Sequence, residues 1–150
     1  MKTITAKNFK PYGKVIEYPN KTKKGKGRNL WRIVHTESAK VGWRVAYLVL
    51  RDKTLGQMGC HPTTDETFEP IKGRALLFVA TSRDLSAIEC FKLDQPVIVN
   101  KGVWHNVITL TSETEIKIVE NANVTSKIWK FGFRVKSFNE LKQKIQRVSS

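Results

Sequence analysis

The sequence predicts an all-β barrel with a short helical turn near its N-terminus and a helix at its C-terminus. Three observations support this class: strand-like runs fill the chain, turn residues separate them at short and regular intervals, and helical spacing appears only at the two ends. The expected strands are 14–18, 30–35, 41–50, 55–61, 66–71, 75–81, 87–93, 96–100, 105–110, 115–121 and 128–135.

The two helical pieces are predicted from their caps. Thr5 is placed to cap a short turn that reaches Phe9 and ends before Pro11. Ser137 and Glu140 form a capping-box sequence, which predicts a helix that begins near Ser137. The apolar residues that follow recur at helical spacing: Leu141, Ile145 and Val148. With 150 residues and 40% hydrophobic content the chain can bury a sizeable core, and no linker or repeat interrupts it, so we expect one domain over residues 1–150.

The charge balance is strongly basic, with 27 lysines and arginines against 13 acidic residues and a net charge of +14. The densest run, residues 20–28, contains two glycines and like charges that repel each other, which predicts a flexible loop. Such a surface attracts small anions and binds polyanions non-specifically. No recognisable nucleic-acid-binding motif accompanies the charge, so specific nucleic-acid binding is not favoured.

Cys60 and Cys90 both lie in apolar, strand-like stretches, and two such residues do not make a disulfide framework. We expect two buried free thiols. No apolar run reaches the length of a membrane helix, and the first residues lack the apolar core of a signal peptide. These features predict a cytoplasmic protein without a membrane partner.

Two of the three histidines and one glutamate lie at the ends of predicted strands. His61 ends one strand, Glu66 begins the next after a short turn, and His105 begins a third after a Lys-Gly turn. Strand ends of this kind can converge inside a small barrel. Two imidazoles and a carboxylate then supply either metal ligands or general acid and base groups.

Strand alternation supports this convergence. Gln57, Gly59 and His61 share one face of their strand, while Glu66 and Phe68 share one face of the next. Because Gly59 has no side chain, it leaves space beside His61 for a small substrate. Lys101 shares the parity of His105 if the intervening chain stays extended.

The spacing is similar to the two motifs of the cupin superfamily. In the first motif a histidine, four residues, a glutamate, six residues and a glycine correspond to His61, Glu66 and Gly73, whereas Gly59 replaces the motif's first histidine. In the second motif Gly102 and His105 match. Asn100 replaces the proline of that motif and Thr109 replaces its asparagine.

The flanking residues resemble one cupin branch, the ureidoglycolate lyase family of purine catabolism, over about residues 5–121. The residues that carry this resemblance are 9–16, Leu50-Arg51, His61-Pro62, Phe68, Pro70, Gly73, the strand 75–80 and Gly102-Val103-Trp104-His105. Two positions depart from the family pattern, because Glu66 replaces a glutamine and Asn106 replaces a histidine. The resemblance implies a cupin-like β-barrel of jelly-roll type and the cleavage of ureidoglycolate to glyoxylate and urea.

Two mechanisms fit this implied activity. In the first, His61, Glu66 and His105 act as acid and base groups, which requires the pKa values of glutamate and histidine to move towards neutrality. In the second, the same three residues hold a divalent metal such as Zn, Mn, Fe or Ni. Substrate contacts are expected from Gln57, Phe68 and Trp104, and the substrate carboxylate is expected to bind Arg51 or Lys101, with Arg44 as a further candidate.

Other interpretations remain open at this point. The chain is also compatible with a metal-binding cupin of different activity, or with a non-catalytic cupin-like module that uses the basic loop 20–28 as a contact surface. By analogy with cupins, in which an edge strand often pairs with a neighbouring chain, we expect a homodimer.

Overall fold

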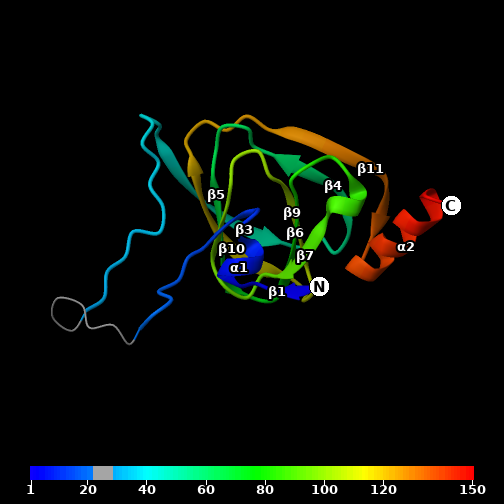
Figure 1. The fold of residues 1–150 in the computed structure, drawn as a ribbon, viewed down its shortest axis with the longest axis horizontal. Coiled ribbons are helices and arrows are strands. Elements are labelled where there is room, and N and C mark those ends of the chain that lie inside the picture. Colours follow the sequence, from blue (N-terminus) through cyan, green and yellow to red (C-terminus); the bar gives the residue numbers. More distant parts are fainter. Residues whose placement is uncertain (22–28) are drawn as a thin grey trace.

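The computed structural model describes residues 1–21 and 29–150, which form two β-sheets that face each other across a core (Figure 1). The strands are β1 (Lys2–Thr3), β2 (Gly13–Val15), β3 (Trp43–Leu50), β4 (Leu55–Cys60), β5 (Glu66–Lys72), β6 (Ala75–Ala80), β7 (Glu89–Lys92), β8 (Val97–Val99), β9 (Trp104–Thr109), β10 (Thr114–Asn121) and β11 (Lys127–Val135). The helices are α1 (Ala6–Phe9), the 3-10 helix η1 (Leu85–Ala87) and α2 (Phe138–Val148).

The larger sheet has the strand order β1-β7-β6-β9-β4-β11, and the smaller sheet has the order β2-β8-β5-β10-β3. Apart from the parallel pair β1–β7, neighbouring strands are antiparallel. Two facing sheets of this kind are typical of a jelly-roll barrel. The predicted all-β class with a helical piece at each end is therefore confirmed.

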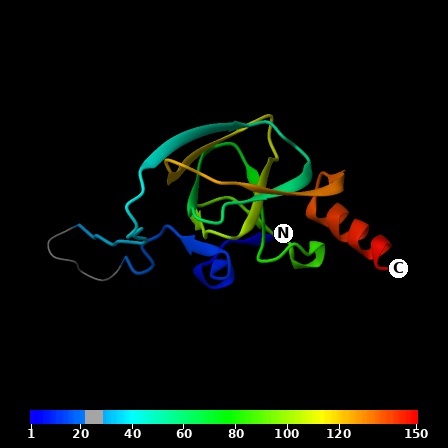
Figure 2. The same ribbon diagram turned by 90° about the horizontal axis from the view of Figure 1, so that it is seen from above.

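Alternation along the strands divides the apolar residues between two cores. One core lies between the sheets and includes Phe9, Leu77 and Phe91. The other includes Phe78 on β6 and Leu141 on α2, so α2 packs on the outer face of the larger sheet. Figure 2 shows α2 at the opposite end of the molecule from the segment that leads into β3.

Both predicted caps are present. The Thr5 hydroxyl accepts a hydrogen bond from the Asn8 backbone N–H, and the Asn8 side chain accepts one from the Thr5 backbone N–H, which completes a capping box around α1. The Ser137 hydroxyl accepts a hydrogen bond from the Glu140 backbone N–H at the start of α2. These short-range contacts explain why both ends were predictable from sequence.

Three details of the predicted strands are wrong. The run 30–35 forms no strand, because its large apolar side chains face solvent; Trp31 is 86% exposed and Ile33 is 68% exposed. The run 87–93 is shorter than expected, since η1 occupies its beginning and β7 starts only at Glu89. The two-residue strand β1, which pairs with β7, was not predicted. Most of the basic loop 20–28, namely residues 22–28, lies outside the described residues.

Cys60 and Cys90 are buried free thiols, as predicted. Burial raises the pKa of Cys90 to about 12 and also raises the pKa of Cys60, which Lys127 partly opposes. None of the helices in the described part of the chain is long and apolar enough to cross a membrane.

Candidate active site and metal centre

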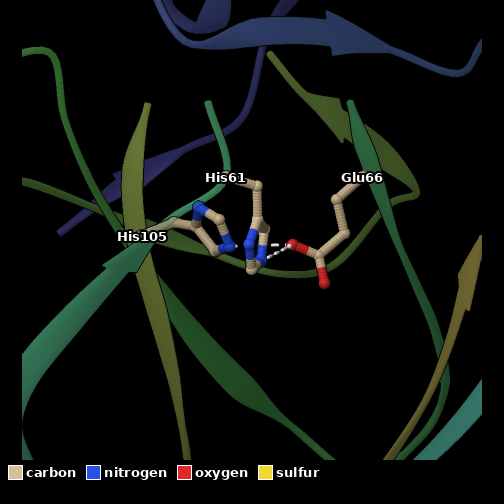
Figure 3. Close-up of side chains that lie close together, drawn as sticks. All are labelled: His61, Glu66 and His105. Carbon is tan, nitrogen blue, oxygen red and sulfur yellow. Dashed lines mark ion pairs between the residues drawn. The ribbon is translucent and has the colours of Figure 1, made fainter. Parts of the chain in front are cut away.

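His61, Glu66 and His105 meet inside the barrel, although they come from different strands (Figure 3). His61 directly follows β4, Glu66 is the first residue of β5, and His105 lies on β9. The pairing of Gly59 on β4 with His105 on β9 brings the two histidines to the same level of the sheet. Glu66 and His105 are each 7% exposed, so this cluster is largely removed from solvent.

A single carboxylate oxygen is the centre of the cluster. Glu66 Oε2 lies 2.8 Å from Nε2 of His105 and 3.1 Å from Nε2 of His61 (Figure 3). The centroids of the two imidazole rings are 5.1 Å apart. The structure thus brings together the three residues that strand alternation had placed on one site.

The other nitrogen of each imidazole has its own partner. Nδ1 of His105 lies 2.9 Å from the Val103 carbonyl oxygen, which only accepts hydrogen bonds, so Nδ1 carries the proton. Nδ1 of His61 lies 3.0 Å from the Ser126 hydroxyl. The Phe68 ring meets the His105 ring edge-on at 5.4 Å between centroids. These contacts fix the orientation of both rings and turn both Nε2 atoms towards Glu66.

The electrostatics of the cluster overturn one expectation. Burial raises the pKa of Glu66, but the nearby imidazoles of His105 and His61 outweigh this effect and lower it to about 2. Glu66 in turn raises the pKa of His61, and burial opposes that shift only in part. The expected movement of the glutamate pKa towards neutrality is therefore wrong. The imidazoles of His61 and His105 stabilise the ionised form of the Glu66 carboxylate.

The donor set fits a divalent metal. Glu66 Oε2 is buried, and no hydrogen bond of normal geometry reaches it within the described part of the chain, despite two nitrogen atoms at 2.8 and 3.1 Å. Since His105 Nδ1 carries the proton, neutral His105 presents a lone pair on Nε2 to this anionic oxygen. Such an arrangement needs a proton or a cation between the two atoms. Two imidazoles and one carboxylate, with partners on each Nδ1, form a typical divalent-metal ligand set.

A cavity of about 270 Å³ opens beside the cluster. Its wall includes Glu66 and His105 together with the predicted substrate contacts Gln57 and Phe68. Gly59 also lines this cavity, and a Cβ atom built at this position would meet only ordinary contacts, with Lys127 O at 3.9 Å as its nearest neighbour. The space expected at Gly59 is therefore part of this cavity.

Three predicted substrate contacts lie elsewhere. Arg51 follows the far end of β3, its side chain is 74% exposed, and its Nη2 lies 3.1 Å from Glu113. Lys101 Nζ lies 3.2 Å from Glu37. Trp104 belongs to the core under α2 and packs against Trp129, because it faces the opposite side of β9 from His105. Arg44, the further carboxylate candidate, pairs with Glu120 at 2.7 Å.

Ser126 is a site residue that sequence reasoning missed. It lies in the turn between β10 and β11 and is 65 residues from His61 along the chain. No local pattern marks a serine in a turn as a histidine partner, so only the fold identifies it.

Comparison with solved structures finds similarities of low identity. The chain is 20% identical to a Bacillus halodurans protein (TM-score 0.44, covering 53% of this chain and 61% of the other). It is 16% identical to Bacillus subtilis oxalate decarboxylase (TM-score 0.46, covering 61% of this chain and 24% of the other). It is also 10% identical to a 3,4-ketoisomerase from Helicobacter canadensis (TM-score 0.45, covering 69% of this chain and 74% of the other). The matched region therefore spans about three fifths of the Bacillus halodurans chain and about a quarter of the decarboxylase chain.

No match was found among curated proteins. The family model described as ureidoglycolate lyase matches residues 1–136, which include His61, Glu66, His105 and all of β11. This match confirms the predicted resemblance and supports a lyase enzyme. The chain belongs to the ureidoglycolate lyase family.

Proposed function

We propose that this protein is a cupin-type lyase that cleaves ureidoglycolate to glyoxylate and urea. The observation that carries the proposal is the convergence of two Nε2 atoms on one buried carboxylate oxygen, Glu66 Oε2, at the wall of a small cavity. Family membership supplies the substrate class. The cavity of about 270 Å³ has room for a compound of this size.

The reaction needs one proton removed and one proton supplied. A base takes the proton from the carbinol hydroxyl, the C–N bond breaks as the carbonyl of glyoxylate forms, and an acid protonates the departing urea nitrogen. His105 suits the base, because the Val103 carbonyl holds the proton on Nδ1, so the proton taken from the hydroxyl is accepted on Nε2 and then lies between Nε2 and Glu66 Oε2. His61 suits the acid, because Glu66 raises its pKa. The ionised Glu66 stabilises the positive charge that moves between the two rings.

In the alternative mechanism, a metal held by His61, Glu66 and His105 would take up both Nε2 atoms in place of their acid and base roles and would polarise the carbinol oxygen. The ionised state of Glu66 supports this possibility, because a carboxylate adds negative charge beside two imidazoles. The same ligands would also support a metal-dependent enzyme that acts on another small anion. The product assay below distinguishes these two functions.

The test combines elemental analysis of the purified protein with assays for released urea and glyoxylate. We expect both products in equal amounts, and we expect His105→Ala to lower the rate by about two to four orders of magnitude, as the loss of an acid or base group does. His35→Ala is the matched control, since His35 pairs with Asp65 outside the cluster. Absence of both products in the wild-type protein would contradict the proposal, and so would full rates in both His61→Ala and His105→Ala.

Glu66→Ala separates the two mechanisms. If Glu66 is a metal ligand, the variant loses bound metal and activity together. If Glu66 acts only through the two imidazoles, metal content is unchanged and only the rate falls.

A further inference from the structure

A second cavity, of about 490 Å³, adjoins the candidate active site. The two cavities share Gln57 and Asn106 in their walls, so a ligand in one lies beside the other. The second cavity is also lined by Lys130 and Arg134 of β11. Neither of these two residues was among the substrate-binding residues predicted from the sequence.

An irregularity in β11 creates this cavity. Lys130 pairs with Gln57 of β4, but the next paired residue of β11 is Val135, which lies opposite Leu55. Four residues of β11 therefore stand against a single residue of β4. Gly132, inside the bulge, adopts a positive φ of 80°, a conformation that glycine accommodates without steric cost. The bulge moves the backbone aside and leaves a hollow in front of Lys130.

Lys130 lies on the face of β11 that is directed towards the site. Side chains alternate along a strand, so Ile128 and Lys130 share one face while Trp129 takes the other. Ile128 lines the cavity with Glu66 and His105, whereas Trp129 is buried in the core under α2. Lys130 is thus on the site face of β11, two residues beyond Ile128.

Lys130 also has no competing carboxylate partner. No ion pair of Lys130 occurs within residues 1–21 and 29–150, whereas Arg51 is paired with Glu113 and Lys101 with Glu37. Arg134 donates a hydrogen bond to the Thr54 hydroxyl at 3.1 Å and keeps its charge available. Among the described residues that line the second cavity, Asp52 is the one carboxylate, so two cations face one anion there and this lining has a net positive charge.

We propose that Lys130, supported by Arg134, binds the carboxylate of the substrate, in place of Arg51 and Lys101. This inference rests on the proposed function, because an α-hydroxy carboxylate places its charged group next to the carbon that reacts. Gln57 pairs with Lys130 and lines both cavities, and Glu66 and His105 line the smaller one, so the proposal places the carboxylate on the Lys130 side of Gln57 and the carbinol carbon on the His105 side. The lysine ammonium acts as a point charge that orients the substrate.

The experiment compares Lys130→Gln with Lys127→Gln, a matched control three residues earlier on β11, on the face opposite to Lys130. In steady-state assays of ureidoglycolate cleavage we expect Lys130→Gln to raise KM by about ten- to hundredfold, the loss associated with one hydrogen bond to a charged group. We expect kcat to change by less than about threefold, since the contact is the same in the ground and transition states. Lys130→Arg should recover most of the affinity, Arg134→Gln should raise KM by a smaller factor, and Lys127→Gln should match the wild type.

A binding measurement keeps this inference separate from the proposed function. Titration calorimetry with glyoxylate, which carries the same carboxylate, should show weaker binding to Lys130→Gln and unchanged binding to Lys127→Gln. If the wild-type protein releases no urea, the proposed function fails and glyoxylate binding alone decides the role of Lys130. Equal glyoxylate affinity in wild type and Lys130→Gln would overturn the inference. The same conclusion follows from a loss of kcat at unchanged KM, or from a wild-type protein that does not bind glyoxylate.

Discussion

Position 59 shows how one residue sets the chemistry available at this site. Gly59 stands where the first cupin motif has a histidine, it pairs with His105, and it lines the cavity that contains Glu66. A Cβ atom at this position would meet no atom closer than 3.9 Å, so the barrel accepts a side chain there. Within the part of the chain that the structure describes, the cluster has three protein ligands, and the residue at position 59, not the backbone around it, leaves the place of a fourth without a side chain.

We predict that Gly59→His raises the affinity of the site for Zn²⁺ or Mn²⁺ by about tenfold or more, because it adds an imidazole to the existing two-histidine, one-carboxylate set. Competition titration against a chromogenic chelator measures this change. Gly59→Leu is the control, since it adds comparable volume without a ligand atom and should leave metal affinity unchanged. Equal metal affinity in Gly59→His and the wild type would show that the side chain cannot reach the cluster.

At the scale of elements, α2 is the helix whose boundaries are best explained. The Ser137 hydroxyl accepts a hydrogen bond from the Glu140 backbone N–H, and the Glu140 carboxylate accepts one from the Lys136 backbone N–H. The helix in turn buries Leu141 in the core on the outer face of the larger sheet. Loss of the cap should therefore loosen both α2 and the residues beneath it.

We predict that Ser137→Ala lowers the free energy of unfolding by about 1 kcal/mol, the usual contribution of a serine cap. Urea denaturation followed by tryptophan fluorescence measures this, because Trp104 and Trp129 lie in the core that α2 covers. Ser112→Ala, in an exposed turn, should change stability by less than about 0.5 kcal/mol. Equal stability of the two variants would contradict the assignment of Ser137 as the cap.

At the scale of the whole molecule, β3 leaves an apolar stripe on the outer face of the smaller sheet. Its outward side chains are exposed: Trp43 by 73%, Val45 by 55%, Tyr47 by 58% and Val49 by 41%. β3 is also an edge strand among the described residues, so its outer backbone groups have no strand partner there. Exposed apolar stripes on a sheet edge favour association with another chain.

The charge on this face favours a second copy of the chain as the predicted partner. Beside the stripe, Lys117 pairs with Glu69, and the neutral Tyr47 hydroxyl donates a hydrogen bond to Glu115, so these three charged groups carry one net negative charge. In a protein with a net charge of +14, two copies repel each other less across this face than the overall charge would imply. The homodimer expected from the sequence stays a prediction, and this face gives it a location.

Sedimentation velocity should therefore show a wild-type dimer, and Val45→Lys combined with Val49→Lys should shift it to a monomer with unchanged circular dichroism. Val148→Lys, on a residue of α2 that is 77% exposed, should remain dimeric. A monomeric wild type, or a dimer that survives both lysine substitutions, would exclude this surface. If a different protein co-purifies with the wild type and is lost when Val45 is changed to lysine, that protein and not a second copy is the partner of this surface.

The sequence was sufficient wherever a structural feature depends on neighbouring residues. Turn residues and strand rhythm predicted ten of the observed strands within a few residues, and the two caps predicted both terminal helices. Alternation along short strands also predicted that His61, Glu66 and His105 meet. The prediction of a strand over residues 30–35 was wrong. The apolar pattern of this run suits a strand, but a strand also needs a hydrogen-bonded partner strand, and the local sequence does not show whether one is present.

Only the tertiary structure decided which charges face the site and what state they hold. Arg51 is paired with Glu113, 62 residues away, and Lys101 with Glu37, 64 residues away, so both are engaged elsewhere. The bulge that exposes Lys130 depends on the register between β11 and β4. The pKa of Glu66 falls to about 2 because two imidazoles from other strands approach one oxygen. Local sequence determines which residues have the chemistry for the site, but Coulomb and hydrogen-bond energies depend on distances that only the fold sets.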